Sequence, residues 1–219
     1  MEPVLYRLAI QPAKFMKPIF FRSLSVGLAM LVGVALLTAG AADAEKKLPE
    51  GKSILTAGGV KSARLNGGEN GRFGTFEIVE VKDQPFAQAI RARVKTQPVN
   101  PWLAQISTVT TQPVKQGDAV LVSFYVRTIE SKNEGGKGRF TVYFGIPDGA
   151  EHTIAQEIVA GTKWTKVQIP ARVAADYEAG KSMVNLDLGY EPQMLEFADI
   201  NLTNFGAKTK LSELPSSGL

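Results

Sequence analysis

Polar and aromatic side chains alternate with apolar ones in several short segments, and these residues have the chemistry to bind a ligand. Binding a sugar requires flat aromatic faces for the apolar C–H face of a pyranose, with amides, carboxylates and guanidinium groups for its hydroxyls. Both kinds of group occupy alternate positions at Gln105, Tyr125, Arg127, Tyr143, Asn185 and Asp187. Laid side by side, these strand faces are predicted to line a carbohydrate-binding cleft. The alternative is ordinary solvated surface, because a half-buried strand always has a polar side.

The two tryptophans and one turn add further candidates. Trp102 lies at a Pro-Trp corner, where it is either a stacking platform for a sugar or a lid on the core. Trp164 follows a glycine turn and begins a strand, so we expect it to pack against the core or at a sheet edge. Tyr190 and Gln193, in the turn after the strand that contains Asp187, are second-rank candidates for the sugar site.

Residues for the common enzymatic chemistries are scarce. The sequence has no cysteine and one histidine, His152, which lies in the turn DGAEHT and is expected to be a solvated loop residue. Neither G-x-S-x-G nor H-E-x-x-H occurs, and the glycine-rich GGENG and NEGGKG lack the Walker spacing. A small glycoside hydrolase would need two carboxylates about 5–9 Å apart across a groove. Its acidic candidates are Glu157, Asp176, Glu178, Asp187, Glu191, Glu196 and Asp199. We therefore expect no enzymatic activity.

The elements that must position these side chains are short strands. Turn-forming segments rich in glycine, proline, asparagine and aspartate separate them, a spacing typical of an all-β sandwich or barrel. Only residues 173–179 could form a helical turn, and the sequence has no internal repeat and no second domain. The predicted strands are residues 73–81, 86–94, 103–110, 120–128, 140–146, 153–159, 165–169, 183–188 and 197–205.

Residues 1–44 have the layout of a secretory signal peptide. Lys17 and Arg22 precede an uncharged apolar run over 24–37, and small residues suited to cleavage follow it. Met16 is a second candidate start. A membrane anchor is the alternative, but the run is shorter than the roughly 20 residues of a spanning helix. The protein is therefore predicted to be secreted or periplasmic, without a membrane span after cleavage.

The charge of the mature chain is close to balanced. Residues 1–44 contain four basic and two acidic residues, so their removal lowers the formal net charge from +4 to +2. No concentrated basic patch of a nucleic-acid-binding protein is present, and nucleic acid is not expected as a partner. Without cysteine, stability must come from the hydrophobic core. The expected divisions are a polar lead-in and N-terminal loop over 45–71, a β-sandwich over 72–207 and a C-terminal tail over 208–219.

An ordered series of segments resembles a known family. It comprises Pro101-Trp102, Pro113 to Asp118, Val120 to Thr128, Phe140 to Phe144, Gly161 to Pro170, Ala174 to Gly180, Leu186 to Gln193 and Glu196 to Gly206. The series is similar to the CenC-type carbohydrate-binding modules, which have a galactose-binding-like jelly-roll fold and often precede xylanase-type glycoside hydrolase domains. The resemblance implies a two-sheet jelly roll whose concave face holds a β-glycan, with no catalysis of its own.

The resemblance also implies a structural calcium near the N-terminal loop and the last strand. Asp199 matches the acidic position of that strand, and the loop with Glu69 and Asn70 offers the oxygen ligands that calcium prefers. A catalytic domain often follows such modules, whereas this sequence ends at Leu219 and is interpreted as a free-standing module. The leading hypothesis is thus an exported polysaccharide- or oligosaccharide-binding protein that requires no cofactor. A structural or protein-interaction domain of the cell envelope ranks second, and a small glycoside hydrolase last.

Overall fold

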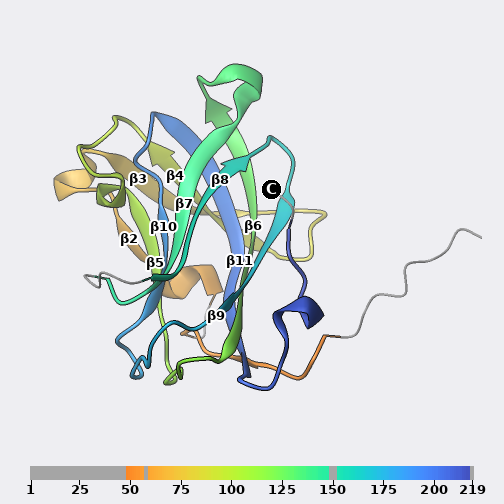
Figure 1. The fold of residues 1–219 in the computed structure, drawn as a ribbon. Helices are drawn as coiled ribbons and strands as arrows, with labels where there is room; N and C mark the ends of the chain where they lie inside the picture. The colour runs from red at the N-terminus through yellow and green to blue at the C-terminus, as the bar shows by residue number, and fades with distance from the viewer. Residues whose placement is uncertain (1–47, 57–58, 148–151, 218–219) are drawn as a thin grey trace, which may run out of the picture. The chain divides into compact units, whose positions relative to one another are not determined.

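The computed structural model describes residues 48–56, 59–147 and 152–217, and these form an antiparallel β-sandwich (Figure 1). The only helical segments among the described residues are short 3-10 turns. The predicted signal segment, residues 1–44, lies outside the described residues. Within the described part of the chain, no helix is long and apolar enough to cross a membrane.

One layer is a six-stranded sheet in the order β3-β4-β11-β6-β9, with β1 pairing with the second half of β11. β11 is the longest strand and pairs with β4 along its first half and with β6 along most of its length. The strands are β1 (Lys52–Ser53), β3 (Gly74–Glu80), β4 (Gln88–Val94), β6 (Ala119–Ser131), β9 (Thr165–Arg172) and β11 (Gln193–Gly206).

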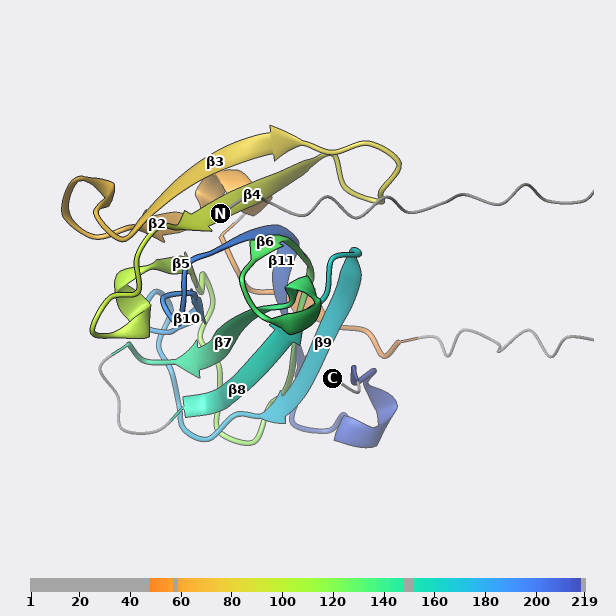
Figure 2. The same ribbon diagram turned by 90° about the horizontal axis from the view of Figure 1, so that it is seen from above.

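The other layer is a five-stranded sheet in the order β2-β5-β10-β7-β8. Viewed from above, its strands occupy one side of the domain, and β11, β6 and β9 lie on the other (Figure 2). From β4 to β11 the chain changes sheet at every step except from β7 to β8, which is the connectivity of a jelly roll. The strands are β2 (Arg64–Asn66), β5 (Gln105–Val109), β7 (Gly138–Gly145), β8 (His152–Ala160) and β10 (Met183–Asp187).

The core lies between the sheets and follows from strand alternation. Every second residue is buried from Val120 to Thr128 of β6 and from Gly138 to Phe144 of β7, because successive side chains of a strand point to opposite faces. Phe124 of β6 contacts Phe140 of β7 at 5.9 Å between ring centroids, and Phe140 meets Phe197 of β11 edge-on at 5.0 Å. Each such buried ring contributes about 1.5–3 kcal/mol to folding.

The predicted all-β jelly roll is confirmed, and the nine expected strands match β3 to β11. The sandwich nevertheless begins before residue 72, since β1 and β2 fall within the segment expected to be a lead-in. These two strands are too short to show alternation in the sequence. Residues 173–179 form no helical turn, because Tyr177 is buried and bridges to Val114. The tail also joins the fold, with Leu214 buried against Ala119 and Leu121.

Candidate functional site

The outward side of the five-stranded sheet is polar at its centre. Along β5, β10 and β7 the inward side chains are apolar except for Thr108, so the intervening residues point away from the core. Several of these outward residues are nevertheless buried, which shows that neighbouring side chains and loops cover them. We call this set the polar face: Gln105, Ser107, Thr141, Tyr143, Asn185 and Asp187.

Strand pairing arranges the polar face in two rows that cross β5, β10 and β7. Adjacent strands lie about 4.8 Å apart, so each row spans roughly 10 Å, comparable with the length of a disaccharide. The first row is Gln105, Asp187 and Thr141, and the second is Ser107, Asn185 and Tyr143.

A chain of short hydrogen bonds fixes one side of the polar face. Ser107 Oγ donates to Gln105 Oε1 at 2.7 Å, and Gln105 Nε2 donates to Asp187 Oδ1 at 2.6 Å. Asp187 is only 4% exposed. Burial raises the pKa of Asp187, and the hydrogen bond from Gln105 opposes that rise. The carboxyl group is therefore held in one orientation in surroundings that disfavour its charge.

Asn185 is the least satisfied member of the polar face. It is 9% exposed, and its Oδ1 is buried without a hydrogen-bond partner among the described residues. Leaving a buried acceptor unpaired costs about 1–3 kcal/mol. Its neighbours in the row, Ser107 and Tyr143, are themselves polar. The centre of the polar face thus contains an enclosed acceptor that no group among the described residues satisfies.

Aromatic rings border the two rows on the side of β7 and β8. The half-buried ring of Tyr143 lies 4.9 Å from that of His152. Burial raises the pKa of the Tyr143 hydroxyl, and nearby Tyr190 and Asp187 raise it further. The Tyr190 hydroxyl shares a 2.5 Å hydrogen bond with Thr141 Oγ1. The guanidinium of Arg139 lies over the Tyr190 ring at 4.9 Å, so Tyr143 is the ring in this group that could stack against a ligand on the polar face.

Trp102 stands at the end of the polar face from which β5 starts. It lies in the 3-10 turn η3 (Pro101–Leu103) and is 52% exposed, so it is a surface ring and not a lid on the core. Asn66 Nδ2 donates to the Trp102 carbonyl at 3.0 Å. Gly189 N donates to Pro101 O at 3.0 Å, and a Cβ at Gly189 would lie 2.7 Å from that oxygen. Glycine therefore lets the turn that carries Tyr190 rest against the Trp102 corner.

Tyr125 and Arg127 are not part of this site. Both lie on β6, on the outward side of the six-stranded sheet, and the polar face belongs to the other layer. The prediction that all six alternating residues line one cleft is therefore wrong. Alternation identifies the outward face of a strand, but it does not say which of the two sheets the strand joins.

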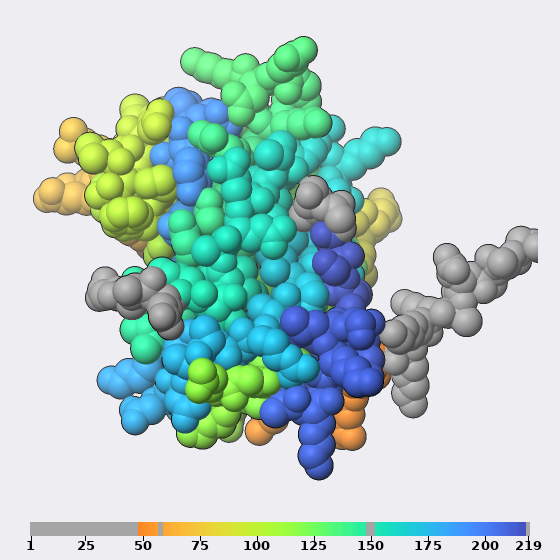
Figure 3. Space-filling view, in the orientation of Figure 1, coloured from red at the N-terminus to blue at the C-terminus, as the bar shows by residue number. Residues whose placement is uncertain are grey.

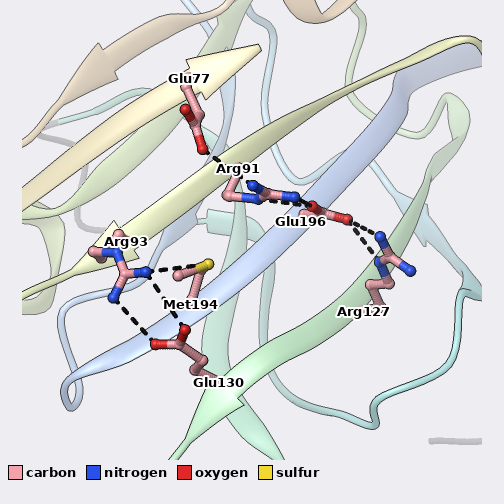
Figure 4. Close-up of polar contacts among 7 residues, drawn as sticks. All are labelled: Glu77, Arg91, Arg93, Arg127, Glu130, Met194 and Glu196. Carbon is pink, nitrogen blue, oxygen red and sulfur yellow. Dashed lines mark hydrogen bonds and ion pairs between the residues drawn. The ribbon is translucent and has the colours of Figure 1, made fainter. Parts of the chain in front are cut away.

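Arg127 instead belongs to an ion-pair ladder (Figure 4). Glu196 of β11 is fully buried and accepts from Arg91 of β4 and Arg127 of β6, each at 2.6 Å. Glu77 of β3 extends the ladder with a 3.3 Å pair to Arg91. The hydrogen bond to Glu196 raises the pKa of Arg91. Arg127 also covers the ring of Trp164 at 4.8 Å, so its contacts within the fold account for its charge.

Tyr125 lies in an aromatic cluster beside this ladder. Phe86 contacts the ring of Tyr125 and that of Trp164, each at 4.9 Å between centroids. Lys166 Nζ also lies over the ring of Tyr125, 5.5 Å from its centroid. Trp164 directly precedes the edge strand β9 and is half-buried, which agrees with its expected packing at a sheet edge. Tyr125 is thus occupied by neighbours within the chain.

Gln193 also has a structural position. Its Nε2 donates to Arg139 O at 2.6 Å and to Leu188 O at 2.9 Å, and its Oε1 accepts from Arg139 N at 2.8 Å. A Cβ at Gly138 would lie 2.7 Å from Gln193 Oε1, so the amide fits tightly between the strands. These contacts tie the start of β11 to β7 and to the segment after β10, and they leave Gln193 buried outside the polar face.

The two residues expected to hold calcium lie far apart. Glu69 precedes β3, whose first residue aligns through β4 with Gln193. Asp199 lies six residues further along β11, roughly 20 Å at the rise of an extended strand. Among the described residues, no group of three or more histidine, cysteine, aspartate or glutamate side chains could hold a metal. The proposed pair is therefore separated, and calcium binding as such stays a prediction.

A second carboxylate continues the first row of the polar face. Glu157 of β8 lies opposite Thr141, so its backbone is roughly 10 Å from that of Asp187 across two strand spacings. Asp187 is buried and bonded to Gln105, and Glu157 lies 3.9 Å from Arg139. Asp187 is thus enclosed, whereas the side chain of Glu157 is exposed.

Sequence reasoning missed three members of the site. Ser107 and Thr141 alternate with buried apolar residues in the same way as Gln105 and Tyr143, so the alternation could have identified them. His152, expected to be a solvated loop residue, is the first residue of β8 and packs on Tyr143. No sequence signal marks this contact, because a register shift at the Phe144–Gly145 step of β7 turns the histidine outward.

Comparison with known proteins identifies no family. No family model matches the sequence, and no curated protein matches it. Solved structures with a similar arrangement include a CBM4 structure, 12% identical, which matches over 65% of this chain and 84% of its own with a TM-score of 0.45.

Two further structures are similar at the same level. The CBM22-1 xylan-binding domain of Paenibacillus barcinonensis Xyn10C is 14% identical over 73% of this chain and 97% of its own, with a TM-score of 0.44. The family 11 carbohydrate-binding module of Clostridium thermocellum, in complex with a β-1,3-1,4-mixed-linked tetrasaccharide, is 15% identical over 72% and 96%, with a TM-score of 0.39. At such low scores and identities, none of these likenesses carries an inference about function.

Proposed function

We propose that the chain is an exported, non-catalytic carbohydrate-binding protein whose polar face binds a polysaccharide or oligosaccharide. The observation that carries the proposal is the pair of rows of hydrogen-bonding side chains on one face of the sheet, with the rings of Tyr143 and Trp102 beside them. The signal-like pattern of residues 1–44 supports export.

The chemistry of the polar face suits a sugar better than other small polar ligands. A sugar hydroxyl can donate and accept a hydrogen bond at the same time. The two rows offer hydroxyl, amide and carboxyl groups, one from each strand, as partners for such hydroxyls. Tyr143 and Trp102 offer flat rings at the margins, against which the apolar side of a pyranose stacks. A ligand with only charged groups would leave these rings unused.

A neutral glycan is the expected ligand class at this face. The two rows contain Asp187 but no lysine or arginine, so an added carboxylate would find no cation within the rows. A neutral hydroxyl requires no such cation. Neutral β-glycans, xylan and mannan are therefore the polymers to test first.

Affinity gel electrophoresis of the purified protein against xylan, β-glucan, mannan and pectin, with and without calcium, tests the proposal. We expect retardation by at least one neutral polymer. Tyr143→Ala and Trp102→Ala should each weaken binding about tenfold, the worth of one stacked ring. Tyr125→Ala is the matched control, because it removes the same ring from the opposite sheet and should leave binding unchanged.

Two results would reject the proposal. A folded protein that no polymer retards would not bind carbohydrate, and the cell-envelope interaction domain would then be the better hypothesis. Equal losses from Tyr143→Ala and Tyr125→Ala, with folding intact in both, would show that the polar face is not the site. Released sugar in the same incubations would instead indicate hydrolysis.

A further inference from the structure

A hollow lies at the end of the six-stranded sheet. It has a volume of about 700 Å³, and none of its lining residues belongs to the polar face. We call it the basic pocket, and its charged lining residues are Arg93, Lys95, Glu130 and Lys132, with Pro192 and Gln193 between them.

The sheet topology creates this pocket. Gln193 begins β11 and pairs with Val94 of β4 on one side and Ser131 of β6 on the other. β4 and β6 therefore reach the start of β11 together, and their next residues, Lys95 and Lys132, stand on either side of it. Two strand spacings separate the backbones of these lysines by roughly 10 Å. The segment that follows β6, residues 132–137, protrudes at the top of the domain in green (Figure 3).

The charges of the pocket do not cancel. Glu130, its one lining carboxylate, lies 3.1 Å from Arg93 and neutralises it (Figure 4). Lys95 Nζ donates only to the carbonyl of Gly71, at 3.3 Å, which leaves its charge uncompensated. The side chain of Lys132 has no hydrogen bond or ion pair with any described residue. Two positive charges thus face a hollow with no anion to balance them.

We propose that the basic pocket binds an acidic polysaccharide through carboxylates of successive uronate residues. Two separated ammonium groups in an open hollow suit a chain with repeated charges better than one small anion, which would need converging donors. No aromatic side chain lines the pocket among the described residues, so it lacks the stacking surface of a single-stranded nucleic-acid site. This proposal does not depend on the neutral-glycan site of the polar face.

Isothermal titration of the full chain with an oligogalacturonate, at low and at physiological salt, tests this inference. We expect binding that weakens as salt screens the charges. The double variant Lys95→Gln and Lys132→Gln should lower the affinity about tenfold, as loss of two exposed charge pairs predicts. Lys208→Gln, which removes an exposed lysine from the turn after β11, is the matched control and should bind like the wild type.

Several outcomes would overturn the inference. These are absence of binding, an unchanged affinity in the double variant, or equal affinity for inorganic phosphate or single-stranded DNA. The two sites are separated by crossed variants, since Tyr143→Ala should leave oligogalacturonate binding intact and the lysine variants should leave neutral-polymer retardation intact. A negative binding result at one site therefore does not affect the test of the other site.

Discussion

At the scale of single residues, surroundings decide what each side chain does. Asp187 and Glu196 are both buried carboxylates on outward strand positions. Glu196 is bound by two guanidinium groups, which stabilise its charge. Asp187 has only an amide donor, and burial dominates its pKa. Glu196 is therefore part of a structural ion-pair network, whereas Asp187 is a buried carboxyl group at the site proposed to bind sugar.

Asp187 should make the stability of the fold depend on pH. Its pKa is raised in the folded state, so the folded protein binds this proton more tightly than the unfolded chain does. Its contribution is therefore most favourable at low pH and is lost as pH rises through the raised pKa. Asp187→Asn removes the charge and keeps an acceptor for Gln105, so it should raise the melting temperature at pH 7.

Thermal unfolding of wild type and Asp187→Asn between pH 3 and pH 8 measures this effect. The difference between them should shrink as pH falls toward the unfolded-state pKa of about 3.9. Glu157→Gln, an exposed carboxylate in the same row, is the control and should change little. A difference for Asp187→Asn that stays constant over this range would contradict the role assigned to its burial.

At the scale of strands, the ion-pair ladder and the polar face use the same geometry for different ends. Both place side chains of neighbouring strands in one row across a sheet. In the ladder, opposite charges alternate from Glu77 through Arg91 and Glu196 to Arg127, so each group has a partner. In the polar face, the second row has an unpaired acceptor at its centre, Asn185 Oδ1. The ladder is complete within the chain, and the polar face is not.

Arg127→Ala should therefore lower stability and leave sugar binding unchanged. The substitution removes one of the two partners of the fully buried Glu196 and the cation over Trp164. A loss of about 1–3 kcal/mol in the free energy of unfolding is expected for a charged group left partly unpaired. Urea denaturation measures the loss, and affinity electrophoresis of the folded variant measures binding.

Arg93→Ala is the matched control for this substitution. Its pair with Glu130 is about half exposed on both side chains, and such surface pairs contribute about 0–1 kcal/mol. A variant Arg127→Ala that stays fully stable but loses polymer binding would return Arg127 to the ligand site.

At the scale of the whole domain, the C-terminal tail completes the six-stranded sheet. Leu214 packs with Ala119 and Leu121 on the outward side of β6, apart from the main core. Ser217 N donates to Gln168 O of the edge strand β9, and Ser217 Oγ accepts from Gln168 N. The tail lies in dark blue beside β9 (Figures 1 and 3). It covers an edge that would otherwise be free to pair with another chain.

Ending the chain at Lys210 should destabilise the domain and expose this edge. The truncation removes the burial of Leu214, worth about 1.5–3 kcal/mol, and uncovers Leu121. We expect a lower melting temperature and concentration-dependent association in size-exclusion chromatography. Leu214→Ala in the full-length chain should lower stability but keep the edge covered, so it should remain monodisperse. A truncated chain as stable and monodisperse as wild type would show that the tail is dispensable.

The alternation of residues along the sequence determined the all-β class, nine strands and the outward side of each, because the side-chain period of a strand is local. It therefore identified Gln105, Tyr143, Asn185 and Asp187, which the structure brings into adjacent rows. Only the tertiary structure decided that Tyr125 and Arg127 lie on the other sheet. Sheet membership depends on pairing between residues far apart in the chain, and alternation carries no record of it. The same pairing between distant residues buries Gln193, whose amide links β11 to β7. It also brings Lys95 and Lys132 to one pocket.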